Sequence, residues 1–485
     1  MPRTGREYVL GLDEGTTGVR AAVVNASCAV VAESYLELSA AFPKPGWVEQ
    51  DASAIWDATQ EVAKRALAAA GIAPGDLAAV GITNQRGSAV VFERSGRPIG
   101  PVLTWQDQRT TARCVELLGK GLFILPMTAA TKYEWLVREH GRGIARGDLR
   151  CGTIDTWLAS RLSGGTAHAT DHSNLSSSGV YDLVGGGYDA RVLEELTLDP
   201  AWLPEIVQTS AAFGETDAAS FGARVPLASL SGDQHAAMYA QACHAPGSVK
   251  LSLGTSGMMQ LHAGTELGAP GPGAYPLVLW SLDGTRQFCH EGATLTAGAA
   301  AQWLRDGLGL VTDVRQLEAL ARSVPSTEGV WAVPAFGGLG TPHLDLDARG
   351  IIGGLSRGST KAHVARAVLE GIAWRSAEVL DSLGSALPER PTRIRVDGGA
   401  ATNDLLLEML ADFGGVAVER PVVHESAVLG AGLLAGRAVG LWSDREVAAS
   451  WRAERLFEPR LGADERATRR ERWNQLVKVT REAGH

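Results

Sequence analysis

Two short turns rich in glycine and threonine are the segments of this chain best suited to chemistry. The first spans residues 13–18 (DEGTTG), and the second, 254–257 (GTSG), follows about half the chain later. Each stands between two apolar runs, 8–12 and 19–24 around the first turn, which predicts a β-hairpin. Glycine turns let backbone N–H groups approach a phosphate closely, and the threonine hydroxyls add further donors. One such turn is typical of any hairpin, but two of them indicate a duplicated unit that clasps the phosphates of one nucleotide.

Acidic residues occupy three places where phosphate chemistry could use them. Asp13 lies in the first turn, and its carboxylate can hold Mg²⁺ directly or through water. Asp233, in the segment SGDQHAA, can serve as a base that orients an attacking hydroxyl or as a helix-capping residue, and spacing favours neither role. Asp397 begins the loop DGGA, which suits a nucleotide lying against backbone but equally suits an ordinary strand-to-helix connection.

The segments around these residues alternate between helical and strand patterns. Residues 51–70 have apolar positions at helical spacing and end at a glycine that can cap the helix, and residues 403–413 form a second strong helix. Residues 78–83 and 393–396 have the character of buried strands. This alternation predicts an α/β fold.

The length of the chain predicts two domains. A single hydrophobic core stops growing near roughly 250 to 300 residues, and this chain has 485. The most natural boundary follows the helix that starts near Gln234, so we expect domains of residues 1–242 and 243–485.

Charge and cysteine usage exclude several classes of function. The net charge is −9, and basic residues form no stripe, which argues against nucleic acid or an anionic membrane as a partner. The five cysteines are scattered and never form a CxxC pair, so neither a disulfide framework nor a zinc site is indicated. The N-terminus lacks a signal-peptide pattern, and no apolar run is long enough to span a bilayer. We therefore expect a soluble cytoplasmic protein.

Nine ordered motifs resemble the FGGY carbohydrate kinases, and within them the glycerol kinases, over essentially the whole chain. The stretches that carry the resemblance are LDEGTTGVRAAV (12–23), PKPGWVEQDASAIW (43–56), GITNQR (81–86), TWQDQRT (104–110), GTIDTWL (152–158), SGDQ (231–234), AQWLRD (301–306), VPAFGGLGTPHLDLDARG (333–350) and RVDGGAATND (395–404). The resemblance implies two actin-like (ribonuclease H-like) domains flanking a deep cleft, with substrate on the N-terminal side and nucleotide on the C-terminal side. It also implies ATP and Mg²⁺ as cofactors and a small polyol or sugar as the phosphorylated partner.

The resemblance assigns roles residue by residue. Asp233 would be the catalytic base, and Asp13 would serve the magnesium. The nucleotide-binding residues implied are Thr16, Thr17, Arg20, Gly254, Thr255, Gly298, Gln302, Gly399 and Asn403. The substrate-binding positions implied are Arg86, Gly87, Trp105, Met127, Asp233, Gln234 and Met258.

Four positions depart from the glycerol kinase pattern. Glu14 replaces a glutamine in the first turn, and its role is open. Gly87 replaces a glutamate whose carboxylate binds substrate hydroxyls, while Met127 and Met258 replace a tyrosine and a phenylalanine. Loss of a buried hydrogen-bonding group strongly changes how a site discriminates between substrates. We expect Gly87 to free volume in the substrate pocket and the two methionines to adapt to the shape of the substrate.

These departures leave alternatives to glycerol. One is a kinase of a ketose, a tetritol or another larger alcohol. An alternative of a different class is an actin-like ATP-binding switch module without kinase activity, although Arg86, Trp105 and Asp233 favour an enzyme because a switch needs no substrate-facing base. The sequence leaves the substrate, the regulation and the oligomeric state open. A homo-oligomer is one of the open alternatives.

Overall fold

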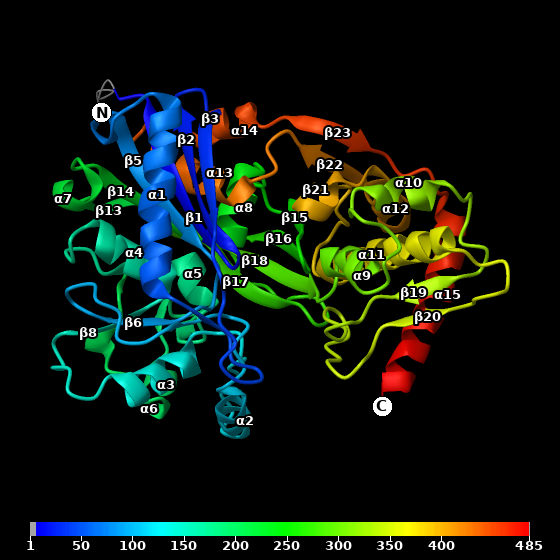
Figure 1. Cartoon of the computed structure of the whole chain (residues 1–485), viewed down its shortest axis with the longest axis horizontal. Helices are drawn as coiled ribbons and strands as arrows, with labels where there is room; N and C mark the ends of the chain where they lie inside the picture. Colours follow the sequence, from blue (N-terminus) through cyan, green and yellow to red (C-terminus); the bar gives the residue numbers. More distant parts are fainter. Residues whose placement is uncertain (1–5, 485) are drawn as a thin grey trace. The chain divides into compact units, whose positions relative to one another are not determined.

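A computed structural model describes residues 6–484, which divide into two compact units (Figure 1). Unit 1 comprises Met1–Ala242, Leu277–Phe288 and Ser426–Trp451. Unit 2 comprises Cys243–Pro276, Cys289–Glu425 and Arg452–His485. The first break along the chain lies between Ala242 and Cys243, and two later segments then return to unit 1.

A six-stranded sheet forms the centre of unit 1. Its strands stand in the order β13 (Ser210–Glu215), β14 (Pro226–Gly232), β5 (Leu77–Asn84), β1 (Tyr8–Gly15), β2 (Gly18–Asn25) and β3 (Val30–Glu37). Strands β14, β5 and β1 are parallel, and the outer strands are antiparallel to their neighbours. The predicted first hairpin is confirmed, but its strands run further than expected, so only Thr16 and Thr17 separate β1 from β2. Asp13 and Glu14 therefore lie on a strand and not in the turn.

Helix α1 (Ala52–Ala70) covers β1, β2 and β3 and confirms the predicted helix (Figure 1). The Asp51 carboxylate accepts the Ser53 N–H at 2.8 Å at its start, and Gly71 ends it with a φ of 69°. Apolar residues of α1 and α4 (Ile154–Leu162) pack with the strands in one core.

A helix from late in the chain also packs on the strands of unit 1. This helix is α13 (Ser426–Ala438), which also packs on α8 (Asp233–Ala240). A Cβ placed on Gly11 would lie 2.2 Å from Val428 O, and one placed on Gly81 would lie 2.1 Å from Ala431 O. Glycine is required at both positions because the backbone of α13 contacts β1 and β5 directly.

Five further helices and strands of unit 1 contribute to a second apolar core. It contains residues of β6 (Val90–Glu93), β8 (Leu149–Gly152), α2 (Thr111–Gly119), α3 (Ala130–His140) and α6 (Ala190–Glu195). These elements carry the segment around Met127, which lies between α2 and α3.

Unit 2 repeats the strand order of unit 1. Within unit 2 the strand order is β18 (Thr285–Thr294, which belongs to unit 2 from Cys289 on), β16 (Gly257–Gly264), β15 (Val249–Leu253), β21 (Arg393–Asp397), β22 (Ala417–Pro421) and β23 (Ala453–Phe457). Strands β15, β21 and β22 are parallel, as β1, β5 and β14 are in unit 1, and β15–β16 is the second predicted hairpin. The predicted α/β class and the duplicated unit are thus confirmed.

The helices of unit 2 include α9 (Gly298–Asp306), α10 (Gln316–Arg322), α11 (Lys361–Gly384), α12 (Asp404–Gly414) and α15 (Ala463–Gly484). Residues of α11 and α12 contribute to the core beneath the sheet together with two residues of α15, Trp473 and Val477. Helix α12 begins within one residue of its expected start. Across residues 6–484, the helices all fall short of the combined length and apolarity that crossing a membrane demands.

Candidate active site

In unit 1, several of the predicted site residues lie at or just after the carboxyl ends of three adjacent parallel strands. Asp13 lies near the end of β1 and pairs with Thr83 of β5, while Gly232 at the end of β14 pairs with Asn84. Arg86 comes two residues after β5, and Asp233 comes directly after β14. The carboxyl ends of parallel strands are where open α/β sheets bind their ligands.

Asp233 is the first residue of α8, and Gly232 is the N-cap. Its Oδ1 accepts the Gln234 N–H at 2.7 Å and lies 3.4 Å from Arg86 Nε. The side chains retain 27% and 11% of their exposure respectively, so the carboxylate is open to a substrate while its partner is nearly covered. A Cβ on Gly232 would lie 2.7 Å from Arg86 Cδ, which shows that glycine makes room for the arginine.

Glu14 is completely buried one residue after Asp13. Its two carboxylate oxygens accept Gln85 Nε2 at 3.1 and 3.2 Å, and its carbonyl accepts the Gln85 N–H at 2.7 Å. Burial raises the pKa of this carboxyl well above its usual value, and the nearby charges of Asp13 and Asp233 raise it further, while the Gln85 hydrogen bond lowers it. The raised pKa favours the uncharged form of Glu14, which is closer in charge to the glutamine that the resemblance leads us to expect at this position.

Two glutamines that the sequence analysis did not single out hold the first turn in place. Gln85 Nε2 also donates to Gln50 Oε1 at 2.8 Å, and Gln50 Nε2 donates to Thr16 O at 3.0 Å. Trp105 Nε1 donates to Thr16 Oγ1 at 3.0 Å. Both glutamines stand inside the quoted motifs, so their place beside predicted site residues was the available signal.

The other two predicted phosphate residues of unit 1 lie close to Tyr35. The Tyr35 hydroxyl donates to Thr17 O at 3.0 Å, and the Arg20 guanidinium lies 4.9 Å from the centre of the Tyr35 ring. Arg20 pairs across the hairpin with Asp13, so the two side chains leave the same face of the sheet.

Gly87 does not free the volume that we expected. It has a φ of 72°, and a Cβ at this position would lie 2.2 Å from Met127 O. The main chain of Met127 thus fills the space that a side chain at position 87 would need. Lys132 Nζ donates to Gly87 O at 3.3 Å from a completely buried position.

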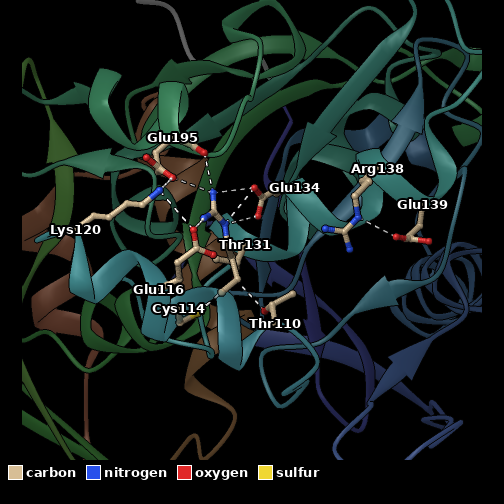
Figure 2. Close-up of polar contacts among 10 residues, drawn as sticks. Thr110, Cys114, Glu116, Lys120, Thr131, Glu134, Arg138, Glu139 and Glu195 are labelled. Atoms are coloured by element: carbon tan, nitrogen blue, oxygen red, sulfur yellow. Dashed lines mark hydrogen bonds and ion pairs between the residues drawn. The ribbon is translucent and has the colours of Figure 1, made fainter.

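Helix α2, which precedes the Met127 segment, is tied to its neighbours by ion pairs (Figure 2). Arg113 binds Glu116 at 2.6 Å, Glu134 of α3 at 3.0 Å and Glu195 of α6 at 3.2 Å. Figure 2 shows the Arg138 and Glu139 pair apart from this cluster. The segment that contains Met127, a residue that is 43% exposed, is therefore held at both ends by α2 and α3.

Part of the TWQDQRT motif builds structure and not the site. Arg109 lies 3.6 Å from the centre of the Trp47 ring and 4.5 Å from that of Trp135, and it binds Glu49 at 2.7 Å. Asp107, completely buried, accepts the Val48 N–H at 2.7 Å. This cluster joins the segment at residues 47–50 to the segment that carries Trp105.

In unit 2, the predicted nucleotide residues gather at the ends of β15 and β21. Gly298 N–H donates to Gly254 O at 2.8 Å, and Ala299 N–H donates to Thr255 O at 3.1 Å. A Cβ on Gly298 would lie 2.5 Å from Gly254 O, and one on Gly398, with a φ of 90°, would lie 2.7 Å from Leu253 O. Three glycines thus allow the turn, α9 and the loop after β21 to meet backbone against backbone.

The remaining predicted residues of unit 2 surround this junction. Asn403 is the N-cap of α12 and accepts the Leu406 N–H at 3.0 Å. Apart from its chain neighbours, no atom of residues 6–484 lies within 4 Å of a Cβ placed on Gly399, so the loop is open there. Gln302 is exposed on α9, and Met258 is partly buried on β16 opposite Ser252. The Ser252 hydroxyl donates to Asp397 Oδ1.

The donor set fits a nucleotide and a magnesium ion supplied together. Among residues 6–484, no group of three or more His, Cys, Asp or Glu side chains is placed to hold a metal ion alone. Mg²⁺ seldom needs such a cage, because one or two carboxylates, several waters and the substrate phosphates complete its octahedron. Asp13 is half-buried at the end of β1 and fits this role.

Comparison with known proteins agrees with this geometry. Residues 8–240 match the N-terminal domain of the FGGY family of carbohydrate kinases, and residues 249–439 match the C-terminal domain. The chain is 44% identical to glycerol kinase from Bordetella parapertussis, with 99% of this chain and 98% of that protein covered. It is 40% identical to glycerol kinase 2 from Thermotoga maritima, with 97% and 98% covered.

Solved structures share the fold of the whole chain. The crystal structure of Plasmodium falciparum glycerol kinase with ADP has a TM-score of 0.91, 26% identity and 98% coverage of each chain. A xylulose kinase from Rhodospirillum rubrum has a TM-score of 0.84 at 23% identity, with 99% of this chain and 100% of that one covered. The predicted two-domain actin-like fold is confirmed, and the chain belongs to the FGGY family of carbohydrate kinases.

Proposed function

We propose that this chain transfers the γ-phosphoryl group of ATP to a hydroxyl of a small polyol or sugar, with Asp233 as the base. Family membership shows the coarser activity, a kinase with an alcohol group as acceptor and ATP as donor. It does not favour the switch-module alternative. The observation that carries the assignment of Asp233 is its half-open carboxylate, which lies 3.4 Å from Arg86 Nε at the carboxyl ends of β14 and β5.

Phosphoryl transfer demands positioning and charge stabilisation more than covalent chemistry from the protein. In the proposed reaction Asp233 accepts the proton of the acceptor hydroxyl, and Arg86 and the Gln234 N–H hold the carboxylate in place. Bound Mg²⁺ offsets the negative charge of the phosphate oxygens. Asp13 would hold this ion, while burial raises the pKa of Glu14 well above its usual value and so favours the uncharged form of this side chain beside the turn.

Unit 2 would bind most of the nucleotide, and unit 1 would bind the acceptor. We assign the nucleotide chiefly to Gly254, Thr255, Gly298, Gly399 and Asn403 of unit 2, where open glycine backbone meets the start of two helices. Thr16, Thr17 and Arg20 of unit 1 would add phosphate contacts, and Arg86, Trp105 and Gln234 would hold the acceptor.

Glycerol is the first acceptor to test, because relatives at 40 to 44% identity are named glycerol kinases. The second candidate is an acceptor larger or less polar than glycerol. The observation that favours a different acceptor is Gly87, which supplies no carboxylate for a substrate hydroxyl and whose Cβ position is occupied by Met127 O. All five cysteines are buried thiols, which fits the reducing cytoplasm that we propose as the location of this chain.

The test is release of ADP from ATP and Mg²⁺ by the purified chain, measured against glycerol, tetritols, pentitols, ketopentoses and ketohexoses. Saturable ADP release with one of these compounds supports the proposal and identifies the acceptor. ADP release that no compound raises above the rate with ATP alone contradicts it.

A further inference from the structure

Three residues at the first turn of unit 1 form a closed ring of hydrogen bonds. Gln50 Nε2 donates to Thr16 O at 3.0 Å, and Gln85 Nε2 donates to Gln50 Oε1 at 2.8 Å. The Thr16 hydroxyl donates to Gln85 Oε1 at 3.3 Å, which closes the ring on the residue where it began. Trp105 Nε1 joins from outside the ring, with a hydrogen bond to Thr16 Oγ1 at 3.0 Å.

Only one direction of the hydrogen bonds fits this ring. The Thr16 carbonyl can only accept, so Gln50 turns its NH₂ group toward it and its oxygen toward Gln85. Gln85 therefore turns its NH₂ group toward Gln50 and its oxygen toward the Thr16 hydroxyl. Since an indole N–H can only donate, the Trp105 contact also requires Thr16 Oγ1 to accept. Both glutamines are only 2% exposed, so water competes little for these bonds.

The single proton of the Thr16 hydroxyl is thus already in use. The Trp105 N–H takes one of the two lone pairs of Thr16 Oγ1, and the other lone pair remains. The phosphate oxygens of ATP can only accept as well, so a contact between one of them and Thr16 Oγ1 would set two acceptors against each other. The hydroxyl of an alcohol, in contrast, can donate to the remaining lone pair.

The next residue, Thr17, is in the opposite situation. It is exposed, and its hydroxyl donates to no other group among residues 6–484. The Tyr35 hydroxyl donates to Thr17 O at 3.0 Å and lies 3.5 Å from Thr17 Oγ1, which leaves the Thr17 proton available. Hydrogen bonds to charged oxygens are stronger than those between neutral groups. The two threonines of the turn therefore offer opposite hydrogen-bonding groups, a donor at Thr17 and an acceptor at Thr16.

We propose that Gln85 is a positioning residue for the alcohol substrate, and that it acts through Thr16. Because Gln85 takes the Thr16 proton, Thr16 Oγ1 receives a hydrogen bond from a hydroxyl of the alcohol, next to Trp105. The phosphate contacts of the turn then come from its main chain and from the Thr17 hydroxyl. This inference rests on the proposed function, because it places a substrate hydroxyl within the same site.

The test compares Thr16→Val with Thr17→Val, two changes of the same size at neighbouring positions. Calorimetric titration with the ATP analogue AMP-PNP and Mg²⁺ measures phosphate binding without an alcohol. Only Thr17→Val removes a hydrogen bond to a charged oxygen, so we expect it to weaken AMP-PNP binding about tenfold and Thr16→Val to change this binding by less than about twofold. Thr468→Val, at an exposed threonine of α15, is the control and should not change AMP-PNP binding.

The same variants are assayed for ADP release with the alcohol that supports the fastest turnover. Thr16→Val should raise the KM for this alcohol about tenfold, because one hydrogen bond to the substrate is lost. Thr468→Val should leave this KM unchanged.

Gln85→Met tests the positioning role. Methionine has a similar length but offers no strong acceptor, so the Thr16 hydroxyl can turn its proton toward the phosphate. In the Gln85→Met chain, adding Thr16→Val should therefore weaken AMP-PNP binding about tenfold, although the same change has little effect in the otherwise unmodified chain. A residue that only stabilised the fold would not create this dependence, and melting temperatures show which variants are folded.

Equal loss of AMP-PNP affinity in Thr16→Val and Thr17→Val would overturn the proposal, and so would an unchanged KM for the alcohol in Thr16→Val. The two threonine variants decide this even where Gln85→Met does not fold, since the ring itself predicts their difference. If no alcohol raises ADP release by the unmodified chain, the proposed function fails. The AMP-PNP titrations still test the direction of the hydrogen bonds in that case, and equal losses would then overturn this inference as well.

Discussion

Gln85 Nε2 donates to both carboxylate oxygens of the buried Glu14, at 3.1 and 3.2 Å, one residue beyond the proposed magnesium residue Asp13. A Glu14 side chain that holds its proton is uncharged, as is the glutamine that the family resemblance leads us to expect at this position. Burial favours the protonated form, and the carboxylates of Asp13 and Asp233 favour it as well.

We therefore expect Glu14→Gln to retain kinase activity. Its stability relative to that of the unmodified chain should increase as the pH rises. The pKa of Glu14 is raised in the folded chain, so between the usual value of 4.5 and the folded value the native state binds more protons than the unfolded state. The unmodified chain loses stability over this range, and Glu14→Gln does not. The measurement is the difference in melting temperature between the two proteins at pH 5 and pH 8.

The control for this prediction is Glu7→Gln, an exposed glutamate whose melting temperature should follow the unmodified chain. A Glu14→Gln difference that is the same at both pH values, or that shrinks at pH 8, would contradict the protonated Glu14.

Asp233→Asn should remove turnover and leave ATP binding intact. An amide keeps the shape and the hydrogen bond from the Gln234 N–H but cannot accept the acceptor's proton. Loss of a general base costs roughly 10²- to 10⁴-fold in kcat. Single-turnover rates and ATP titration test this, and an unchanged kcat would remove Asp233 from its proposed role.

The sequence predicted the elements more readily than the contacts among them. Helix α1, the hairpins and the strands at residues 77–84 and 393–397 follow from local apolar spacing and from glycine at the turns. The return of Ser426–Trp451 to unit 1 was not anticipated, because the contacts of Gly11 and Gly81 with α13 join residues more than half the chain apart.

At the candidate site, too, the sequence predicted local elements but not contacts between distant segments. Asp13, Arg86 and Asp233 could be placed from motifs, since parallel strands bring their carboxyl ends together. The Gly87 expectation was wrong because the course of the Met127 main chain depends on distant packing, which side-chain volumes at position 87 do not reveal.

Gly87→Ala should destabilise unit 1. The new Cβ would require a φ of 72° and would lie 2.2 Å from Met127 O. The left-handed conformation costs roughly 1 to 2 kcal/mol and overpacking a further 1 to 3 kcal/mol, so we expect the free energy of unfolding to fall by at least about 2 kcal/mol. Denaturant unfolding measures the change.

Gly121→Ala separates the two causes of this loss. Gly121 has a φ of 76°, but in the described part of the chain only its sequence neighbours come within 4 Å of its Cβ position, so it reports the backbone cost alone. Equal losses in the two variants would mean that the Met127 carbonyl does not restrict position 87.

Gly298→Ala should weaken ATP binding without unfolding unit 2. The added methyl would lie 2.5 Å from Gly254 O and would push the second turn away from the start of α9. We expect the KM for ATP to rise about tenfold or more, because a shift of about 1 Å at a positioning group can cost two orders of magnitude. Gly358→Ala, whose nearest atom would be 3.7 Å away, should leave the KM for ATP unchanged, and a Gly298→Ala variant with normal ATP affinity would contradict the proposed nucleotide site.

Lys132→Met should raise stability most at low pH. Burial lowers the pKa of Lys132 from 10.5 to about 7, although the charge of Asp107 opposes the shift. Between pH 7 and 10.5 the unfolded chain keeps this proton while the native chain releases it, so the stability of the unmodified chain rises with pH over this range and is lowest below pH 7.

Methionine fills a similar volume without a charge to bury, and it loses the Gly87 O hydrogen bond at every pH. The advantage of Lys132→Met in the free energy of unfolding should therefore fall by on the order of 3 kcal/mol between pH 6.5 and pH 9.5. An advantage that is constant or grows with pH would show that Lys132 keeps its proton in the native chain.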